Sequence, residues 1–292
     1  MNMQFFQALL DGTLMGGVYA LAALGLSLIF GVMKITNFAH GAMMTVGMYA
    51  VYVVSTSLGI SPYIALVFAA ITLFALGYVI QHFLIDKISN APTHNQLLLT
   101  LGVAYILENG LLAVFSPNYK TLDVDDFDGA IQIGAISVSP EKLVAFAVVL
   151  VVTTVIYLIL YKTRTGKAIR ACSQNKEGAK LMGIVIKKTN AVAFGIGALC
   201  TGIAGALLTP ILSIYPTLGE TFQLKCFVIA ILGGMGNLWG ALISGLIVGI
   251  VESLTGYIAG GSWSDLTVYA AFILILLVKP SGLFGRSNRR EH

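Results

Sequence analysis

Long apolar segments separated by short polar ones run along the whole chain. They lie at about 8–33, 42–57, 62–85, 96–116, 143–161, 190–213, 224–257 and 266–279. A hydrocarbon core of about 30 Å is crossed by roughly 20 apolar residues in a helix that rises about 1.5 Å per residue. The pattern therefore predicts an all-α, polytopic integral membrane protein with about eight transmembrane helices, within a range of roughly eight to ten.

Two of these segments contain breaks. The run 224–257 is too long for one straight crossing and carries a glycine-rich step at 233–237, whereas the short run 42–57 follows the sequence NFAHG at 37–41. Because Gly and Asn favour turns over a continuing helix, we expect broken or re-entrant segments at both places. The candidates for helix breaks, or for lining a path through the membrane, are Asn37, His40, Gly41, Gly233, Gly234, Gly236 and Asn237.

Charge placement predicts the orientation of the chain. Apolar residues make up 57% of the 292 and charged residues only 10%, whereas a soluble domain carries about 25% charged residues. Eight of the 17 Lys and Arg residues fall between Lys162 and Lys188, so the net charge of +4 marks a cytoplasmic side rather than a nucleic-acid site. Three more, Arg286, Arg289 and Arg290, lie in the last seven residues, which we also place in the cytoplasm.

This orientation predicts the remaining topology. Loop 162–189 is then cytoplasmic and loop 117–140 external, and the N-terminus is external if every earlier run crosses. An even number of crossings must separate loop 162–189 from the C-terminal tail, and segments 190–213, 237–257 and 266–279 give only three. Either 218–232 crosses as a short helix, which we favour, or one of the other segments does not span. Residues 1–292 form one membrane domain with no separate soluble domain.

Catalytic and metal-binding patterns are absent from the sequence. There is no GxSxG or HExxH motif, the four histidines lack metal-ligand spacing, and the three cysteines form no CxxC pair. A Walker A loop is also missing, because Tyr161 stands where that loop needs Gly. We therefore expect no metal and no cofactor, no enzymatic activity, and ATP hydrolysis only in a separate subunit. The acidic run 123–128 favours a solvated external loop over a Mg²⁺ site.

Three charged residues lie within or at the ends of apolar runs. Glu108, followed by Asn109, sits in the middle of 96–116, so it should face protein or water; whether it meets a solute or only a neighbouring helix stays open. Lys225 and Glu252 lie near the two ends of 224–257, where they either reach the membrane surface or face protein. Spacings of four residues at Gly236 and Gly240, and at Gly245 and Gly249, favour helix packing over pore lining; we assign Gly240, Gly245 and Gly249 to packing.

The polar stretch 165–184 predicts a short helix. Asn175 is a good N-cap, Glu177 falls in the first turn and Gly183 fits the position after the last turn, which together predict two turns over 176–182. One side carries Gly178, Ala179, Leu181 and Met182, and the other carries Lys176, Glu177 and Lys180. Either a membrane surface or a groove on a partner protein could cover the apolar side.

Five motifs in order resemble the permeases of branched-chain amino-acid ABC importers, and most closely the smaller of the two permease subunits. They cover nearly the whole chain and are YALAALGLSLIFG at 19–31, ITNFAHG at 35–41, GKAIRA at 166–171 with AKLMGI at 179–184, LGGMGN at 232–237, and KPSGLFG at 279–285. Many members carry an acid directly after the His-Gly step, where this chain has Ala42. Urea-type and amide-type permeases share most of these motifs.

The resemblance implies an alternating-access permease in the cytoplasmic (inner) membrane of a prokaryote. It implies a second related permease subunit, two cytoplasmic ATPase subunits, an extracytoplasmic solute-binding protein, surrounding membrane lipid and a branched-chain or other apolar amino acid as solute, with no nucleic-acid partner. Urea or a short amide, or a secondary transporter acting alone, are the alternatives. The family's coupling helix, which docks on the ATPase, would correspond here to Asn175, Lys176, Glu177, Ala179, Lys180, Leu181, Met182 and Gly183, with Ala179, Leu181 and Met182 as the contact face.

Overall fold

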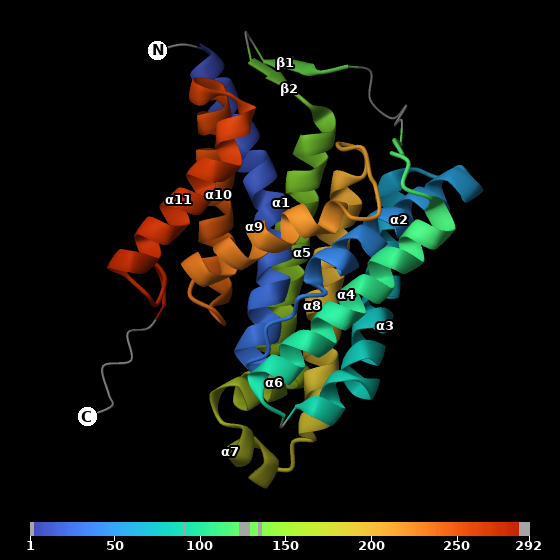
Figure 1. Cartoon of the computed structure of the whole chain (residues 1–292), viewed down its shortest axis with the longest axis vertical. Helices are drawn as coiled ribbons and strands as arrows, with labels where there is room; N and C mark the ends of the chain where they lie inside the picture. The colour runs from blue at the N-terminus through green and yellow to red at the C-terminus, as the bar shows by residue number, and fades with distance from the viewer. Residues whose placement is uncertain (1–2, 90, 123–128, 134–135, 286–292) are drawn as a thin grey trace.

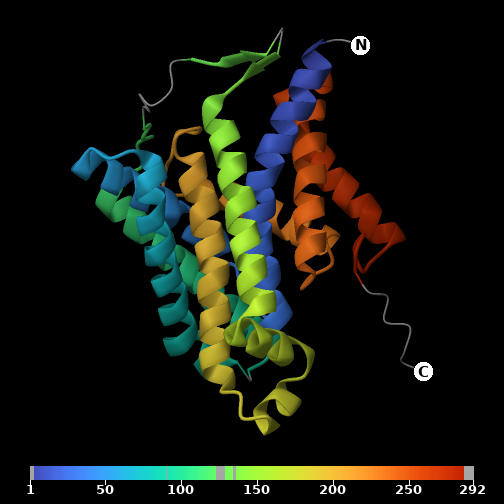
Figure 2. The ribbon, with the colours of Figure 1, turned by 180° about the vertical axis from the view of Figure 1, so that it is seen from behind.

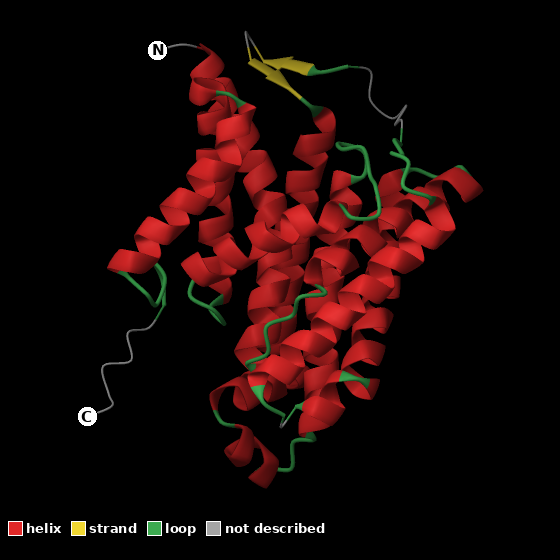
Figure 3. Cartoon of the chain, viewed as in Figure 1, coloured by secondary structure: helices red, strands yellow, loops and turns green. Residues whose placement is uncertain are grey.

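The computed structural model describes residues 3–89, 91–122, 129–133 and 136–285, so the acidic run 123–128 and the basic tail 286–292 lie outside the described residues. Long helices make up most of the fold (Figures 1 and 3). The helices are α1 (Met3–Met33), α2 (His40–Leu58), α3 (Pro62–Phe83), α4 (Thr93–Phe115), α5 (Pro140–Lys162), α6 (Arg164–Gln174), α7 (Lys176–Leu181), α8 (Ile186–Leu208), α9 (Leu218–Leu232), α10 (Leu238–Ala259) and α11 (Gly261–Val278). A short 3₁₀ helix, η1 (Ile85–Ile88), follows α3.

Eight helices in the described part of the chain are long and apolar enough to cross a membrane. They are α1, α2, α3 with η1, α4, α5, α8, α10 and α11. Their ends follow local rules. Pro62 and Pro140 open α3 and α5 at the position where the missing N–H costs nothing, and Gly59 ends α2 with a left-handed φ of 62°. The predicted membrane fold is thus confirmed.

Two helices form the centre of the bundle. Most residues of α1 and α8 are buried, and the two helices pack on each other. The helices α10, α9 and α5 also pack against α1, and α2 and α3 also pack against α8. Small residues allow this contact: a Cβ added at Gly25 would meet the backbone of Gly197. In contrast only a small share of α4, α5 and α11 is buried, although their sequences are strongly apolar, as expected of helices that face lipid.

The two ends of the bundle differ in character. The start of α1 and the hairpin of β1 (Ile131–Ile133) and β2 (Ile136–Val138) lie at one end, and α6 and α7 lie at the other (Figures 1 and 2). The antiparallel register pairs Ile131 with Val138 and Gln132 with Ser137. Because α6 and α7 carry the basic cluster, we keep the prediction that their end faces the cytoplasm, and we refer to it below as the cytoplasmic end; the end with the start of α1 and the hairpin is referred to as the external end.

The prediction that 218–232 crosses the membrane by itself is wrong. α9 has only 15 residues, or about 22 Å at 1.5 Å per residue, and it runs obliquely across the bundle (Figure 1). From the outer end of α8, the irregular segment 209–217 and α9 together bring the chain back down to the start of α10. Similarly, the irregular segment 34–39 turns back from the end of α1, so that α2 begins midway along the bundle. The predicted breaks are confirmed at both places.

Candidate functional site

The cytoplasmic end carries a short, well-capped helix. The amide of Gly178 donates to the side-chain oxygen of Asn175 at 2.9 Å, which closes the start of α7. At its other end the amides of Gly183 and Ile184 donate to the carbonyls of Lys180 and Ala179, and Gly183 has a φ of +79°. These local bonds fix α7 as a helix of six residues, slightly shorter than the two turns predicted.

Two adjacent apolar side chains project from the end of α7. Leu181 is 87% exposed and Met182 is 83% exposed, whereas Ala179 is only 4% exposed. Assigning Ala179 to the contact face was therefore wrong, because its side chain packs into the protein. Lys176, Glu177 and Lys180 are exposed, and the Lys176 ammonium donates at 3.4 Å to the carbonyl of Met33 at the end of α1.

A second helix, which the sequence did not lead us to expect, supports α7. In α6 the residues Gly166, Ile169 and Cys172 are buried, and a Cβ at Gly166 would meet the last carbonyls of α5. Burial raises the pKa of the Cys172 thiol, so that thiol stays protonated at neutral pH and acts as a packing group. The spacing of three between these buried residues was the available signal for α6.

The first helix break is held by a buried polar network. The Asn37 side-chain oxygen accepts from the amide of Ala39 at 3.0 Å, and the Asn37 carbonyl accepts from the Gln223 side chain at 3.2 Å. The other end of Gln223 accepts from the amide of Gly41. His40 Nε2 lies 2.9 Å from the carbonyl of Ala22. The structure thus brings Asn37, His40 and Gly41 together, fully buried, and adds Gln223 from α9.

The second break is a glycine turn between α9 and α10. Gly234 and Gly236 have φ values of +77° and +90°, which side chains with a Cβ rarely adopt. Asn237 caps α10 by accepting from the amide of Gly240 at 3.2 Å, and its amide group donates to the carbonyl of Phe284 at 3.1 Å. Gly233 and Gly240 touch each other across the turn, so Gly240 packs against this turn rather than against another helix.

The other two packing glycines lie between helices. A Cβ at Gly245 would meet Ala20, and one at Gly249 would meet the backbone of Gly12 and Gly16. Both therefore allow α10 to lie directly on α1.

Glu108 and Asn109 point in different directions. Glu108 is 8% exposed, while Asn109 is exposed and donates to the carbonyl of Tyr105 on its own helix at 2.8 Å. No contact in the described structure joins either residue to the network of Asn37 and Gln223.

Lys225 and Glu252 form part of an ionic cluster inside the bundle. The Lys225 ammonium lies 2.8 Å from a Glu252 carboxylate oxygen and 3.0 Å from one of Asp265. Tyr19 approaches Glu252 at 3.5 Å. The Lys225 side chain is 8% exposed, so the alternative that it reaches the membrane surface is wrong. The cluster joins α1, α9, α10 and α11, and Asp265 was missed because it lies 40 residues from its partner Lys225.

The chain is similar in sequence to known transport permeases. Residues 8–277 match the family described as "Branched-chain amino acid transport system / permease component". The chain belongs to this family. The permease protein LivH of a high-affinity branched-chain amino acid transport system from Escherichia coli (strain K12) is 30% identical over 97% of this chain and 96% of its own. A probable branched-chain amino acid transport permease protein LivH from Methanocaldococcus jannaschii is also 30% identical, over 95% of this chain and 92% of its own. Among solved structures, PsaBC from Streptococcus pneumoniae in complex with Fab matches with a TM-score of 0.49 at 14% identity, over 96% of this chain and 97% of that one.

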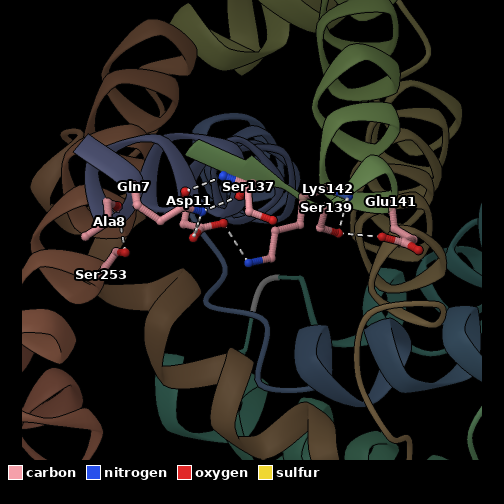
Figure 4. Close-up of polar contacts among 8 residues, drawn as sticks. All are labelled: Gln7, Ala8, Asp11, Ser137, Ser139, Glu141, Lys142 and Ser253. Carbon is pink, nitrogen blue, oxygen red and sulfur yellow. Dashed lines mark hydrogen bonds and ion pairs between the residues drawn. The ribbon is translucent and has the colours of Figure 1, made fainter. Parts of the chain in front are cut away.

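This multi-pass membrane permease also has a polar anchor at its external end (Figure 4). Gln7 on α1 exchanges two hydrogen bonds with the backbone of Ser137 on β2, one of them at 3.0 Å. One turn further along α1, Asp11 pairs with Lys142 of α5 at 2.8 Å. The anchor therefore fixes the hairpin and the start of α5 against α1.

We expect Asp11→Asn to lower thermal stability only slightly. Both side chains of the Asp11–Lys142 pair are about one quarter exposed, and such pairs contribute about 0–1 kcal/mol. Thermal unfolding of the detergent-purified protein measures the change, with Asp86→Asn in the cytoplasmic Lys187–Asp86 pair as a matched control. A loss several times that of the control would contradict the expectation.

Proposed function

We propose that the chain is the permease subunit of an ATP-driven importer that translocates branched-chain or other apolar amino acids by alternating access across the cytoplasmic membrane of a prokaryote. Support comes from membership of the permease family, the eight spans and the names of the similar permeases. The proposed partners are a second related permease subunit, two cytoplasmic ATPase subunits and an extracytoplasmic solute-binding protein.

The observation that carries the proposal is the exposed pair Leu181 and Met182 at the end of α7. Two adjacent apolar side chains with more than four fifths of their surface exposed, at the basic and polar end of the molecule, are a recognition feature for a protein groove. An ATPase groove that covers them would couple nucleotide-driven motion to the membrane helices. The rest of α7 then serves as a rigid mount, because Ala179 packs inward and both ends are capped.

Contacts within the chain would carry the motion of α7 to the interrupted helices. α7 is mounted on α6, which turns tightly on the end of α5, and Lys176 bonds the end of α1. Beyond that end, Asn37 and Gly41 are clamped by Gln223 of α9. A displacement of α7 therefore reaches both oblique helices, α2 and α9, and we propose that these helices move during transport. Solute binding would depend mainly on the separate binding protein, which agrees with the low number of charged residues in the spans.

The test is an uptake assay with Leu181→Glu and Met182→Glu in cells that carry the complete importer. An acid at either position places a charge in an apolar contact, so we expect at least about a tenfold loss of ATP-dependent leucine uptake and of co-purifying ATPase. Lys167→Glu is the matched control, because it introduces the same acid at an exposed site of α6. Because Leu181 and Met182 are exposed, thermal stability of both variants should stay unchanged. Full uptake and assembly in both variants would refute the coupling role.

Two further measurements in the uptake assay distinguish the proposed function from a urea or amide permease and from a secondary transporter. Competition by isoleucine and valine, but not by urea or acetamide, is expected if the solute is a branched-chain amino acid. Robust uptake by the chain alone, with no ATPase present, would favour a secondary transporter and overturn the proposal. The number and identity of co-purifying subunits test the predicted partners directly.

A further inference from the structure

A cavity of about 760 Å³ opens at the cytoplasmic end of the bundle. It lies between the end of α1, the corner of α5 and α6, the glycine turn before α10, and residues 280–285. Its volume falls within the roughly 300–1,000 Å³ typical of small-molecule sites. Leu181 and Met182 are not among its lining residues, so the cavity is distinct from the surface proposed to meet the ATPase.

All charged side chains that line the cavity are positive. Lys34 and Arg170 line it, and no Asp or Glu does. Neither cation forms an ion pair with a carboxylate in the described part of the chain. The Arg170 guanidinium lies 4.6 Å from the centre of the Tyr161 ring, and its buried Nε has no hydrogen-bond partner among the described residues. A buried donor of this kind is costly unless a ligand or water meets it.

Other groups around the cavity also favour an anion. The N-terminus of the 22-residue helix α10 reaches it through Asn237 and Leu238, and a helix N-terminus carries a partial positive charge. Ser173 and Gln174 add polar groups near Arg170. A planar guanidinium that is already oriented by ring stacking fits the oxygens of a phosphate group.

The aromatic residues place the cavity at the depth of lipid headgroups. Trp239 lines it, is 54% exposed, and lies 5.6 Å from Tyr157, which stacks on Tyr161 at 4.5 Å. Such clusters of Trp and Tyr mark the boundary between hydrocarbon and water. In Figure 1, α7 extends farther from the centre of the bundle than the ends of α1 and α10 that border the cavity.

We propose that this cavity binds the phosphate headgroup of an anionic phospholipid, held by Arg170 and Lys34 and flanked by Trp239. A bound lipid would connect α1 and α6, which belong to the proposed coupling route, to the glycine turn before α10. The same phosphate chemistry could come from a free phosphate ion, which the experiment separates from lipid.

Quenching of Trp239 fluorescence by brominated lipids tests the proposal on the full chain with its co-purifying subunits, reconstituted in vesicles. The Trp263→Phe background leaves Trp239 as the one tryptophan of this chain, and subtracting the signal of an additional Trp239→Phe variant removes those of other subunits. We expect brominated phosphatidylglycerol to quench more strongly than brominated phosphatidylcholine. Removing one cation, by Arg170→Gln or Lys34→Gln, should lower the relative affinity for phosphatidylglycerol about fivefold, from about 1 kcal/mol per cation near an anionic surface.

Matched variants and competitors define the outcomes. Lys167→Gln removes one charge from the same end without lining the cavity and should change nothing, whereas Arg170→Lys should keep part of the preference. Equal quenching by both lipids, or a preference that survives both Arg170→Gln and Lys34→Gln, would overturn the proposal. Loss of the preference when inorganic phosphate is added would assign the cavity to free phosphate and overturn the lipid. None of these outcomes depends on which solute the permease carries.

Discussion

Replacing Gly249 with valine is expected to prevent the permease from accumulating as a folded protein. Gly249 lies where α10 rests on α1, and a Cβ there would meet the backbone of Gly12 and Gly16. Backbone atoms of a fully packed helix cannot move aside as the end of a flexible side chain can. The cost should therefore exceed the about 1–3 kcal/mol of ordinary overpacking, because the two helices must separate along their contact.

Fluorescence-detected size-exclusion chromatography of the tagged protein measures this loss as a missing monodisperse peak. Gly110→Val in α4 is the matched control, since it is the same substitution in a spanning helix, and a Cβ at Gly110 meets nothing within 4 Å. We expect the control to give the parental peak and nearly the parental thermal stability. A normal peak for Gly249→Val would show that α1 and α10 do not pack as the structure has them.

Features that depend on a few consecutive residues could be predicted from the sequence. The spans follow from apolar runs, and the two breaks follow from Asn and Gly, whose effects act within a turn or two. The capped helix α7 likewise follows from Asn175 and Gly183, which bond to groups three or four residues away. The predicted orientation rests on a local signal of the same kind, the cluster of basic residues in one loop, and it stays a prediction.

Features that depend on residues far apart in the chain could not be predicted from the sequence. Gln223 meets Gly41 across 182 residues, and nothing in its own segment identifies that partner. The burial of Ala179 is decided by how α7 rests on the bundle, so a helical pattern alone placed it wrongly on the exposed side. α9 was predicted to cross the membrane because an even number of crossings must separate the two basic segments. That argument counts how often the chain crosses and not whether each crossing is one helix. Here the irregular segment 209–217 and the oblique helix α9 together make one crossing.

The assignment of α7 as a coupling helix could be predicted only in part from the sequence. Before the family resemblance, the apolar side of α7 fitted a membrane surface as well as a partner protein. The structure narrows that side to Leu181 and Met182, and the capped ends make it a rigid presentation of those two side chains. The partner that covers these two side chains is another protein, whose surface this sequence does not encode. Its identity therefore stays a proposal with its own test.

Replacing Lys225 with methionine is expected to destabilise the permease severely. The Lys225 ammonium lies within 3.0 Å of both carboxylates, so its removal leaves Glu252, whose side chain is 21% exposed, and Asp265, whose side chain is 51% exposed, without their cation. Breaking a buried ion pair by removing one partner costs about 3–5 kcal/mol, most of it from the uncompensated charge that is left behind. Solvent screens the half-exposed Asp265, so we expect a loss at the lower end of this range, mainly from the unpaired charge of Glu252. A shape-matched apolar side chain fills the space of lysine, so the loss reports charge rather than a cavity.

Neutralising the carboxylates as well gives the decisive comparison. The triple variant Lys225→Met, Glu252→Gln and Asp265→Asn removes every charge of the cluster, and we expect it to regain most of the stability lost by Lys225→Met, because no unpaired charge remains. Lys187→Met is the control, since its pair with Asp86 is half exposed and should be worth at most about 1 kcal/mol. Thermal unfolding of all three variants in the same detergent measures the series.

A triple variant as unstable as the single one would show that the hydrogen bonds of the cluster, rather than its charge balance, hold α9, α10 and α11 together. Leucine uptake by cells that carry the triple variant then separates structure from transport. Parental uptake means that the cluster only joins helices, and lost uptake with parental stability means that its charges take part in transport.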